Sequence, residues 1–404
     1  MAAAVCQPLA GRVADQFGAR RVFCLGLLAV CLTGALAPLS PSFGWLVGFR
    51  VAQAAGTSVA FPCALVLIRA AGAAGAGTGA RPPAAALGVL SVASSVSAAL
   101  GPVLGGVLVS LAGWQAIFLA NVPVTLAGLA AALAWLPADR VDRDRPEPPA
   151  TDVVGVALFA LGLAGLLGFL LSVPGGPVWP LLPVGPVAAG LLVVWERRVD
   201  APFLDVRMLA GNRPLMRIYG QFAAVNVAFY AAFYALPLWF ERERGMPPRM
   251  AGLLLLPVAG LGLVATPAAV RLIARRGIRL TMLVGTATLC AGSVLLLGFG
   301  RATPIWVIVL ACSVLGLPNG FTNLGLQASL FAATPPDGTG AAAGLFQTSR
   351  YLGAILSTSL LGVVFARSVN TAGLRAVATV MVVISALLVA SVTAGHSPSA
   401  RTRR

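Results

Sequence analysis

A short polar loop near the start of the chain carries the first residues that could do chemistry. It reads Gly11-Arg12-Val13-Ala14-Asp15-Gln16-Phe17-Gly18-Ala19-Arg20-Arg21 and lies between two apolar stretches. Glycines permit close approach and positive φ. The Asp15 carboxylate can pair with Arg20 or Arg21, or it can meet a helix N-terminus, where negative charge is stabilised. We expect a gating loop built on Gly11, Asp15, Gly18, Arg20 and Arg21, although a plain basic loop would have a similar composition.

Arginines inside apolar stretches are the second group of candidates. Arg50 opens the run Arg50-Val51-Ala52-Gln53-Ala54-Ala55-Gly56, and Gln53 lies one turn further on the same helix face. A charge within the bilayer is costly and is a functional hypothesis by default. We expect a functional role for Arg50 and Gln53, although Arg50 could instead extend to the membrane surface.

A run of small residues marks another stretch. Gly101-Pro102-Val103-Leu104-Gly105-Gly106 follows Gly88 and Ser97. Small side chains let a neighbouring helix approach closely, and a proline removes a backbone donor and kinks a helix. Packing alone would explain the small residues but not their combination with Gly-Pro and Gly-Gly. We expect a hinge or seal made of Gly88, Ser97, Gly101, Pro102, Gly105 and Gly106.

Polar and aromatic side chains at helical spacing predict a substrate cavity. In the stretch 215–240 they are accompanied by Phe229 and Phe233. Aromatic and polar groups together suit bulky, lipophilic and often cationic compounds, whereas the alternative is polar contact between helices. Arg350, about ten residues into its span, must face protein or water. The expected cavity residues are Gln221, Asn226, Tyr230, Tyr234, Asn323, Gln327, Gln347 and Arg350.

The chain offers little for catalysis or for proton binding within the membrane. None of the twelve acidic residues lies deep in an apolar stretch, and the single His, His396, is in the polar tail. The six Cys have no metal-ligand spacing, and no phosphate-binding loop is present. We therefore expect no enzyme activity, no metal and no cofactor.

Membrane-spanning helices must position these residues. Hydrophobic residues make up 58% of the 404 and charged residues only 10%, whereas soluble domains carry about 25% charged residues. Apolar stretches near 20 residues match the thickness of a bilayer. Twelve complete helices are predicted at 22–39, 45–68, 85–110, 116–136, 153–173, 181–196, 215–240, 249–271, 280–300, 304–331, 340–366 and 373–394. Residues 2–10 are expected to be the end of one further helix.

The arginines predict the orientation. The net charge is +16 and all 28 cationic residues are Arg. With 11–21 placed inside, twenty arginines fall on the inner side and six on the outer side, which puts the C-terminus in the cytoplasm. The positive charge therefore indicates membrane topology, and we expect no nucleic-acid partner.

An internal repeat predicts two parallel halves. Residues 8–20 align with 267–279, pairing Gly18 with Gly277, and residues 88–107 align with 344–363, pairing Gly88 with Gly344. The separation leaves two helices, 153–173 and 181–196, inserted between the halves. The expected parts are an N-terminal bundle (1–136), a linker with the two inserted helices (137–213), a C-terminal bundle (214–394) and a cytoplasmic tail (395–404).

These motifs resemble those of the major facilitator superfamily. Gly11, Asp15, Gly18 and Arg20 match its signature loop G-x-L-A-D-R-x-G-R-R, from which Val13, Gln16 and Ala19 depart. Arg50 and Gln53 resemble its R-x-x-Q-G motif, whose arginine is associated with proton coupling. The run from Gly88 to Gly106 resembles the antiporter motif G-x8-G-x3-G-P-x2-G-G, with Ser97 in place of a glycine.

Two further runs are similar to those of the fourteen-helix drug:proton antiporters of this superfamily. They are 113–123, GWQAIFLANVP, and 202–207, PFLDVR. The resemblance implies an all-α fold of two pseudo-symmetric bundles plus two inserted helices. It also implies proton-coupled efflux of hydrophobic drugs or toxic compounds from the bacterial inner membrane. The expected partners are the lipid bilayer, a small hydrophobic or cationic substrate and protons, with the chain acting as a monomer.

Three alternatives remain at this stage. The chain could be a dedicated exporter of an endogenous secondary metabolite. In the resembled family an acidic residue is common in the first helix, which is expected to be missing here together with most of the second. Either Met1 is a misassigned start of a longer protein, which we favour, or the chain is a truncated and inactive product.

Overall fold

Helices account for the secondary structure throughout the part of the chain that the structure describes. This computed structural model describes residues 2–75, 84–139, 152–199, 202–204, 206–335, 338–366 and 368–394, and no strand occurs among them. The predicted all-α membrane fold is confirmed. Nine helices among these residues are long and apolar enough to cross a membrane.

The helix bounds follow the predicted spans closely. The helices are α1 (Ala2–Phe17), α2 (Ala19–Leu36), α3 (Phe43–Ser58), α4 (Ala60–Gly75), α5 (Ala84–Ala112), α6 (Gln115–Leu119), α7 (Asn121–Trp135), α8 (Val153–Ser172), α9 (Val184–Glu196), α10 (Val206–Gly211), α11 (Arg213–Arg242), α12 (Pro248–Leu297), α13 (Ile305–Ala333), α14 (Thr339–Val364) and α15 (Thr371–Ala394). Short 3₁₀ turns are η1 (Ala37–Leu39), η2 (Val173–Gly175) and η3 (Trp179–Leu181).

The 50-residue helix α12 contains two of the predicted spans. Its backbone breaks at Gly277, where φ is 84° and ψ is 171°. The expected loop at 11–21 is wrong, because α1 continues through Asp15 to Phe17 and α2 begins at Ala19. Gly18 alone separates the two helices, with a φ of 96°. These two glycines are partners in the internal repeat. Because positive φ strains any residue with a side chain, both repeats use glycine for the same sharp break between two helices.

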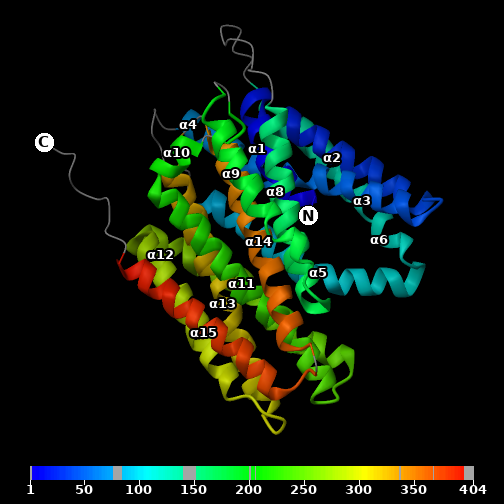
Figure 1. The fold of residues 1–404 in the computed structure, drawn as a ribbon, viewed down its shortest axis with the longest axis vertical. Coiled ribbons are helices and arrows are strands. Elements are labelled where there is room, and N and C mark those ends of the chain that lie inside the picture. The colour runs from blue at the N-terminus through cyan, green and yellow to red at the C-terminus, as the bar shows by residue number, and fades with distance from the viewer. Residues whose placement is uncertain are drawn as a thin grey trace, which may run out of the picture. The chain divides into compact units, whose positions relative to one another are not determined.

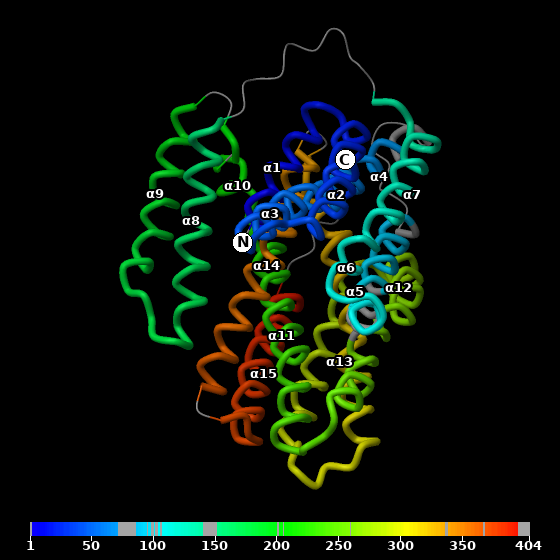
Figure 2. Tube along the Cα trace, turned by 90° about the vertical axis from the view of Figure 1, so that its right-hand side faces the viewer, coloured from blue at the N-terminus to red at the C-terminus, as the bar shows by residue number. Residues whose placement is uncertain are grey.

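The chain packs as two compact units, each built from separate segments. The first contains Met1–Ala86, Leu100–Gly220 and Leu330–Leu352. In it, α2 packs against α3 and α7, and α1 packs against α3, α4 and α8 (Figure 1). The helices α8 and α9 lie side by side as an antiparallel hairpin (Figure 2). The predicted limits of the bundles and linker stay predictions, and the tail 395–404 lies outside the described residues.

The second unit contains Leu87–Ala99, Gln221–Ser329 and Gly353–Arg404. In it, α12 packs against α15. Fully buried side chains at its centre include Trp239, Phe240, Phe299 and Ile308. Most other helix faces carry exposed apolar side chains such as Leu253, Trp306 and Leu387, which is the pattern expected of surfaces that contact lipid.

Candidate functional site

The carboxylate of Asp15 binds the beginning of α14. Its Oδ1 accepts a hydrogen bond from the Gly340 amide at 2.9 Å, and its Oδ2 accepts one from the Ala341 amide at 3.1 Å. The first amides of a helix have no partner within the helix, and its N-terminus carries partial positive charge. Asp15 is expected either to pair with an arginine or to bind a helix N-terminus, and these two bonds show the second role.

Next to these bonds, glycines bring the backbones of α1 and α14 into contact. A Cβ on Gly11 would overlap the carbonyl group of Gly340, and a Cβ on Gly344 would overlap the carbonyl of Gln7. One turn further, Thr348 Oγ1 donates to the Ala4 carbonyl at 2.8 Å. We call this contact, from Ala4 to Asp15 and from Gly340 to Thr348, the α1–α14 seam. Spacing of small residues by four is typical of close helix pairs in membranes.

Gly18, Arg20 and Arg21 meet a residue that the sequence did not single out. Asp139 accepts hydrogen bonds from the Arg20 amide at 3.0 Å and from the Arg21 amide at 2.9 Å, and so covers the N-terminus of α2. The Arg20 guanidinium donates to the Leu133 carbonyl at 2.7 Å. Asp139 also lies where a side chain on Gly18 would be. Sequence distance hides this contact because Asp139 belongs to the polar stretch after α7.

Arg69 is a second residue that sequence reasoning missed. At the end of α4, its Nη1 donates to the carbonyls of Thr334 and Pro335 and to Thr339 Oγ1, at 3.1, 2.8 and 2.6 Å. Its Nη2 donates to the Phe331 carbonyl at 2.6 Å, and the guanidinium lies 4.1 Å from the centre of the Phe331 ring. Arg69 thus joins the end of α13 to the start of α14. From the sequence, Arg69 is assigned only to the positively charged residues on the inner side of the membrane.

Arg50 and Gln53 interact as their spacing predicts. Arg50 Nη1 donates to Gln53 Oε1 at 3.0 Å, and the guanidinium lies 5.5 Å from the centre of the Phe118 ring. Gln53 is buried, whereas Arg50 is exposed. The structure therefore places the two side chains in contact, and their role in coupling stays a prediction.

The run of small residues makes a close helix contact at only one of its described glycines. A Cβ on Gly88 would lie 2.7 Å from Val270 Cγ2 of α12. A Cβ on Gly101 or Gly105 would meet nothing within 4 Å. The expected close approach is thus absent at those two positions, although α5 is helical throughout. Ser97 is exposed, and the side-chain surroundings of Pro102 and Gly106 lie outside the described residues.

The polar residues of α11 divide between two roles. Gln221 Nε2 donates to Ser391 Oγ of α15 at 2.8 Å, and Asn226 Nδ2 donates to the Phe222 carbonyl of its own helix at 2.7 Å. Gln221 and Asn226 thus make the polar contacts between and within helices that are the alternative to a role in the substrate cavity. Tyr230 and Tyr234 instead stack on each other with ring centres 5.7 Å apart.

Phenylalanines extend this stacking into a ladder of four rings. Phe229 and Phe233 also stack, at 5.6 Å, and Phe229 meets the edge of Tyr230 at 5.2 Å. We call Phe229, Tyr230, Phe233 and Tyr234 the aromatic ladder. All four rings are partly exposed, and Tyr234 is the most accessible at 39%. Such a surface can bind apolar rings and cations.

Two amide side chains on α13 keep buried acceptor oxygens without a hydrogen bond among the described residues. They are Asn323 Oδ1 and Gln327 Oε1. Asn323 Nδ2 donates to Oδ1 of Asn319, one turn earlier on α13, at 3.3 Å. A buried acceptor without a donor costs free energy and is a natural place for a ligand or a water. Gln347 and Arg350 are half-buried on α14.

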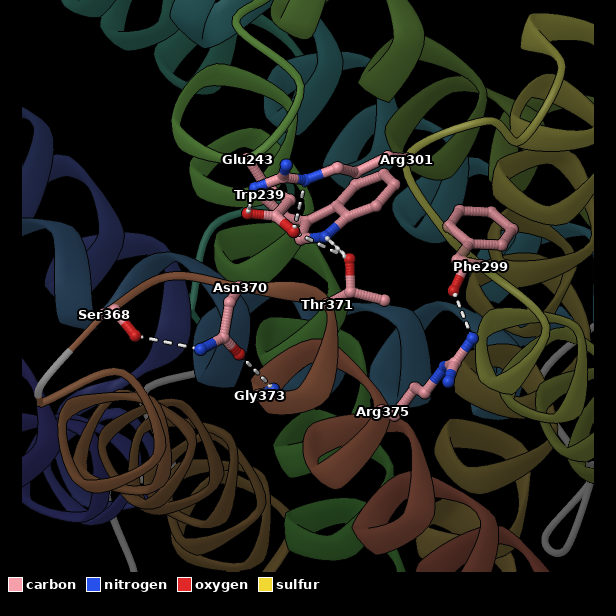
Figure 3. A network of polar contacts seen from close by, with 9 residues as sticks. All are labelled: Trp239, Glu243, Phe299, Arg301, Ser368, Asn370, Thr371, Gly373 and Arg375. Carbon is pink, nitrogen blue, oxygen red and sulfur yellow. Dashed lines mark hydrogen bonds and ion pairs between the residues drawn. The ribbon is translucent and has the colours of Figure 1, made fainter.

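A separate polar network lies in the second unit, around the end of α11 (Figure 3). Arg301 binds both oxygens of Glu243, at 3.0 and 3.2 Å, and Thr371 Oγ1 donates to Glu243 at 3.1 Å. The Trp239 indole donates to Thr371 at 3.3 Å. This network joins the ends of α11 and α15 and the connection between α12 and α13.

Comparison with known proteins agrees with this architecture. Residues 1–358 match the profile of the family described as Major Facilitator Superfamily. The chain is 34% identical to the uncharacterized MFS-type transporter YwoD of Bacillus subtilis over 391 residues, covering 95% of this chain and 84% of the relative. It is 30% identical to the tetracenomycin C resistance and export protein of Streptomyces glaucescens over 388 residues, covering 92% and 68%.

A solved structure shows the same fold. The crystal structure of the human organic anion transporter MFSD10 (TETRAN) superposes with a TM-score of 0.69 at 19% sequence identity. The match covers 96% of this chain and 81% of that chain.

Proposed function

The chain belongs to the major facilitator superfamily, and from this premise we propose that it is a proton-coupled exporter of small hydrophobic or cationic compounds. It is a multi-pass membrane transporter with bacterial relatives, among them an antibiotic resistance and export protein. The observation that carries the proposal is the α1–α14 seam, where Asp15 holds the first amides of α14.

The seam has the properties required of a gate that opens and closes. Charge-assisted hydrogen bonds are stronger than neutral ones, yet each contributes only about 1.5–3 kcal/mol. Backbone contact through Gly11, Gly340 and Gly344 permits the two helices to separate without rearranging side chains. In the proposed cycle, Asp15 releases α14 when the predicted cytoplasmic side opens and binds it again when that side closes.

The aromatic ladder supports the proposed substrate class. Four stacked and partly exposed rings offer faces for planar apolar groups and for cations. Asn323 and Gln327 on α13 add buried acceptor oxygens, which suit a donor or a positive charge on the substrate. Aromatic side chains with a few polar groups are the usual lining of small-molecule sites.

Proton coupling is the part of the proposal that depends most on resemblance. Its support in this chain is the Arg50–Gln53 pair, which corresponds to the family motif associated with coupling. No acidic residue lies deep in a predicted span.

Efflux of a fluorescent cation tests the proposal. Cells that express the chain are loaded with ethidium and energised, and loss of fluorescence is followed with and without a protonophore. We expect export that stops when the protonophore is added and that Asp15→Asn slows about tenfold. Export that continues unchanged with the protonophore would refute proton coupling, and absence of export of any lipophilic cation would refute the substrate class.

A dedicated exporter of one endogenous metabolite is the second candidate. It is favoured by the relative from Streptomyces glaucescens, whose name couples resistance with export of a single antibiotic. Deletion of the gene would then cause one compound to accumulate in the cells and leave sensitivity to ethidium unchanged. A multidrug exporter predicts the reverse.

A further inference from the structure

Two acidic residues that the sequence places at the ends of spans are buried together beside α1. Asp152 precedes α8 and is 8% exposed, and Glu196 ends α9 and is 3% exposed. Asp152 Oδ1 accepts from the Gly155 amide at 2.8 Å and from the Trp195 indole at 2.9 Å. The two carboxylates lie against the same face of Gly155, where a side chain would overlap Asp152 and lie 2.8 Å from Glu196 Oε1. Asp152 thereby joins the start of α8 to the end of α9, which are the two ends of the α8–α9 hairpin.

The same carboxylates hold the segment that follows the hairpin. Glu196 Oε1 accepts from the Leu204 amide at 2.9 Å, and Asp152 Oδ2 accepts from the Phe203 amide at 3.4 Å. Phe203 and Leu204 are 2% and 7% exposed. They belong to the run Pro202-Phe203-Leu204-Asp205-Val206-Arg207, which has no role in the proposed transport cycle so far.

The held segment packs against both helices of the α1–α14 seam. Its apolar cluster includes Leu9 of α1 and Leu345 of α14, together with Phe159 of α8. Leu9 lies between the seam positions Gln7 and Gly11, and Leu345 follows Gly344 directly. The same apolar cluster therefore contacts both helices of the seam, α1 at Leu9 and α14 at Leu345.

Charge joins the hairpin to α1 as well. Burial lowers the pKa of Arg12, and the charges of Glu196, Asp152 and Asp15 act in the opposite direction, Glu196 most strongly. Arg12 lies one turn before Asp15 on α1. Arg12 thus interacts electrostatically with the carboxylate that binds α14 and with the two carboxylates of the hairpin.

We propose that the α8–α9 hairpin braces the gate, with Asp152 and Glu196 as positioning residues that hold Phe203 and Leu204 against α1 and α14. The proposal rests on the proposed function, since it assigns the inserted hairpin a part in the same gate. Loss of a buried acceptor would release the 203–204 segment and remove packing from both sides of the seam. The bonds from Asp15 to α14 would then break more often.

Hydrogen–deuterium exchange measures that opening without any substrate. The Gly340 and Ala341 amides exchange only when Asp15 releases them, so peptides covering 339–348 report the gate. In the purified full chain, we expect Glu196→Ala to speed exchange of these peptides about tenfold, as loss of one buried hydrogen bond predicts. Glu196→Gln keeps an acceptor for the Leu204 amide and should restore most of the protection.

One control variant and one alternative variant make the result specific. Glu243→Gln changes an acid to an amide in the second unit and should leave exchange at 339–348 unchanged. Should Glu196→Ala fail to fold, Leu345→Ala removes one apolar contact of the brace and leaves both carboxylates in place, and it should also speed exchange at 339–348.

The outcome that overturns the brace is faster exchange in the hairpin with unchanged exchange at 339–348 in both Glu196→Ala and Leu345→Ala. Equal loss in Glu196→Gln and Glu196→Ala would overturn the positioning role of the acceptor. The ethidium assay reports the proposed function separately: a chain that exports nothing but shows coupled exchange retains the brace, and an exporter whose exchange is uncoupled retains only the proposed function.

Discussion

Two helix contacts related by the internal repeat use different chemistry. In the α1–α14 seam, Gly11 and Asp15 of α1 meet the start of α14. Their repeat partners on α12 are Val270 and Ala274. In that second contact, which we call the α5–α12 contact, Gly88 lies against the side chain of Val270. One contact is made by backbone and a carboxylate, and the other by an apolar side chain.

The difference separates the features that the fold requires from those of the proposed gate. Both repeats retain a glycine with positive φ at the helix break, Gly18 and Gly277, because the fold needs a sharp turn there. Among the described residues of these two contacts, an acid and backbone contact occur only in the α1–α14 seam. A side chain such as Val270 can shift by rotating, whereas two backbones in contact fit only without a Cβ. The α1–α14 seam therefore depends on a single geometry and can act as a switch.

Filling the seam should have the largest effect. Gly11→Val would overlap the Gly340 carbonyl, so we expect about 3 kcal/mol of lost stability and no ethidium export. The control is Gly252→Val, where a Cβ meets nothing within 4 Å and only helix propensity changes. Thermal unfolding of the purified protein compares the two. Similar losses for both variants would mean that the close backbone contact has no special role.

Asp15→Ala gives the α1–α14 seam the residue type found in the α5–α12 contact. Two hydrogen bonds to the amides of α14 disappear, and we expect about 2 kcal/mol of lost stability of the closed gate and export at least tenfold slower. Glu243→Gln serves as the acid-to-amide control. Export at the normal rate in Asp15→Ala would show that the repeat-related contacts are equivalent.

Arg69→Lys asks whether the start of α14 needs more than Asp15. Lysine keeps the charge but has a single nitrogen, which cannot take both the position of Nη1 at Thr334 and Thr339 and that of Nη2 at Phe331. We expect a loss of about 1 kcal/mol in thermal unfolding and faster exchange at 339–348. Arg301→Lys, at an exposed position, is the matched substitution and should be nearly neutral. Equal effects would assign Arg69 a purely electrostatic role.

The smallest effect is expected for the Glu243–Arg301 ion pair, whose arginine is exposed. The hydrogen bond from Arg301 lowers the pKa of Glu243 below its ordinary 4.5. A carboxylate with a lowered pKa stabilises the fold above its ordinary value, and the stabilisation is lost as pH falls through the lowered value. The difference in Tm between the wild type and Arg301→Gln should thus be present at neutral pH and vanish in acid.

Salt provides the control for that pair. Arg301 is 75% exposed, so high ionic strength should reduce its small contribution at neutral pH. A difference in Tm that persists in acid would assign the contact to packing instead of charge.

Local features of the sequence determined the fold and pointed to the residues of the proposed gate. Hydropathy and length predicted the helices, arginine spacing predicted the Arg50–Gln53 contact, and the repeat predicted that Gly18 and Gly277 share a role. These depend on neighbours within a few turns, or on like residues at a fixed distance, which a single sequence displays directly.

Tertiary structure alone decided the partners of the charged residues. Asp15 could reach an arginine or a helix N-terminus, and packing of α1 on α14 selected the amides of Gly340 and Ala341, 325 and 326 residues away. The roles of Asp139 and Arg69, and the burial of Asp152 and Glu196, follow from the same long-range packing. A carboxylate has the same hydropathy whether it faces water or the N-terminus of a helix. The sequence therefore does not distinguish these two environments, and only the packed chain does.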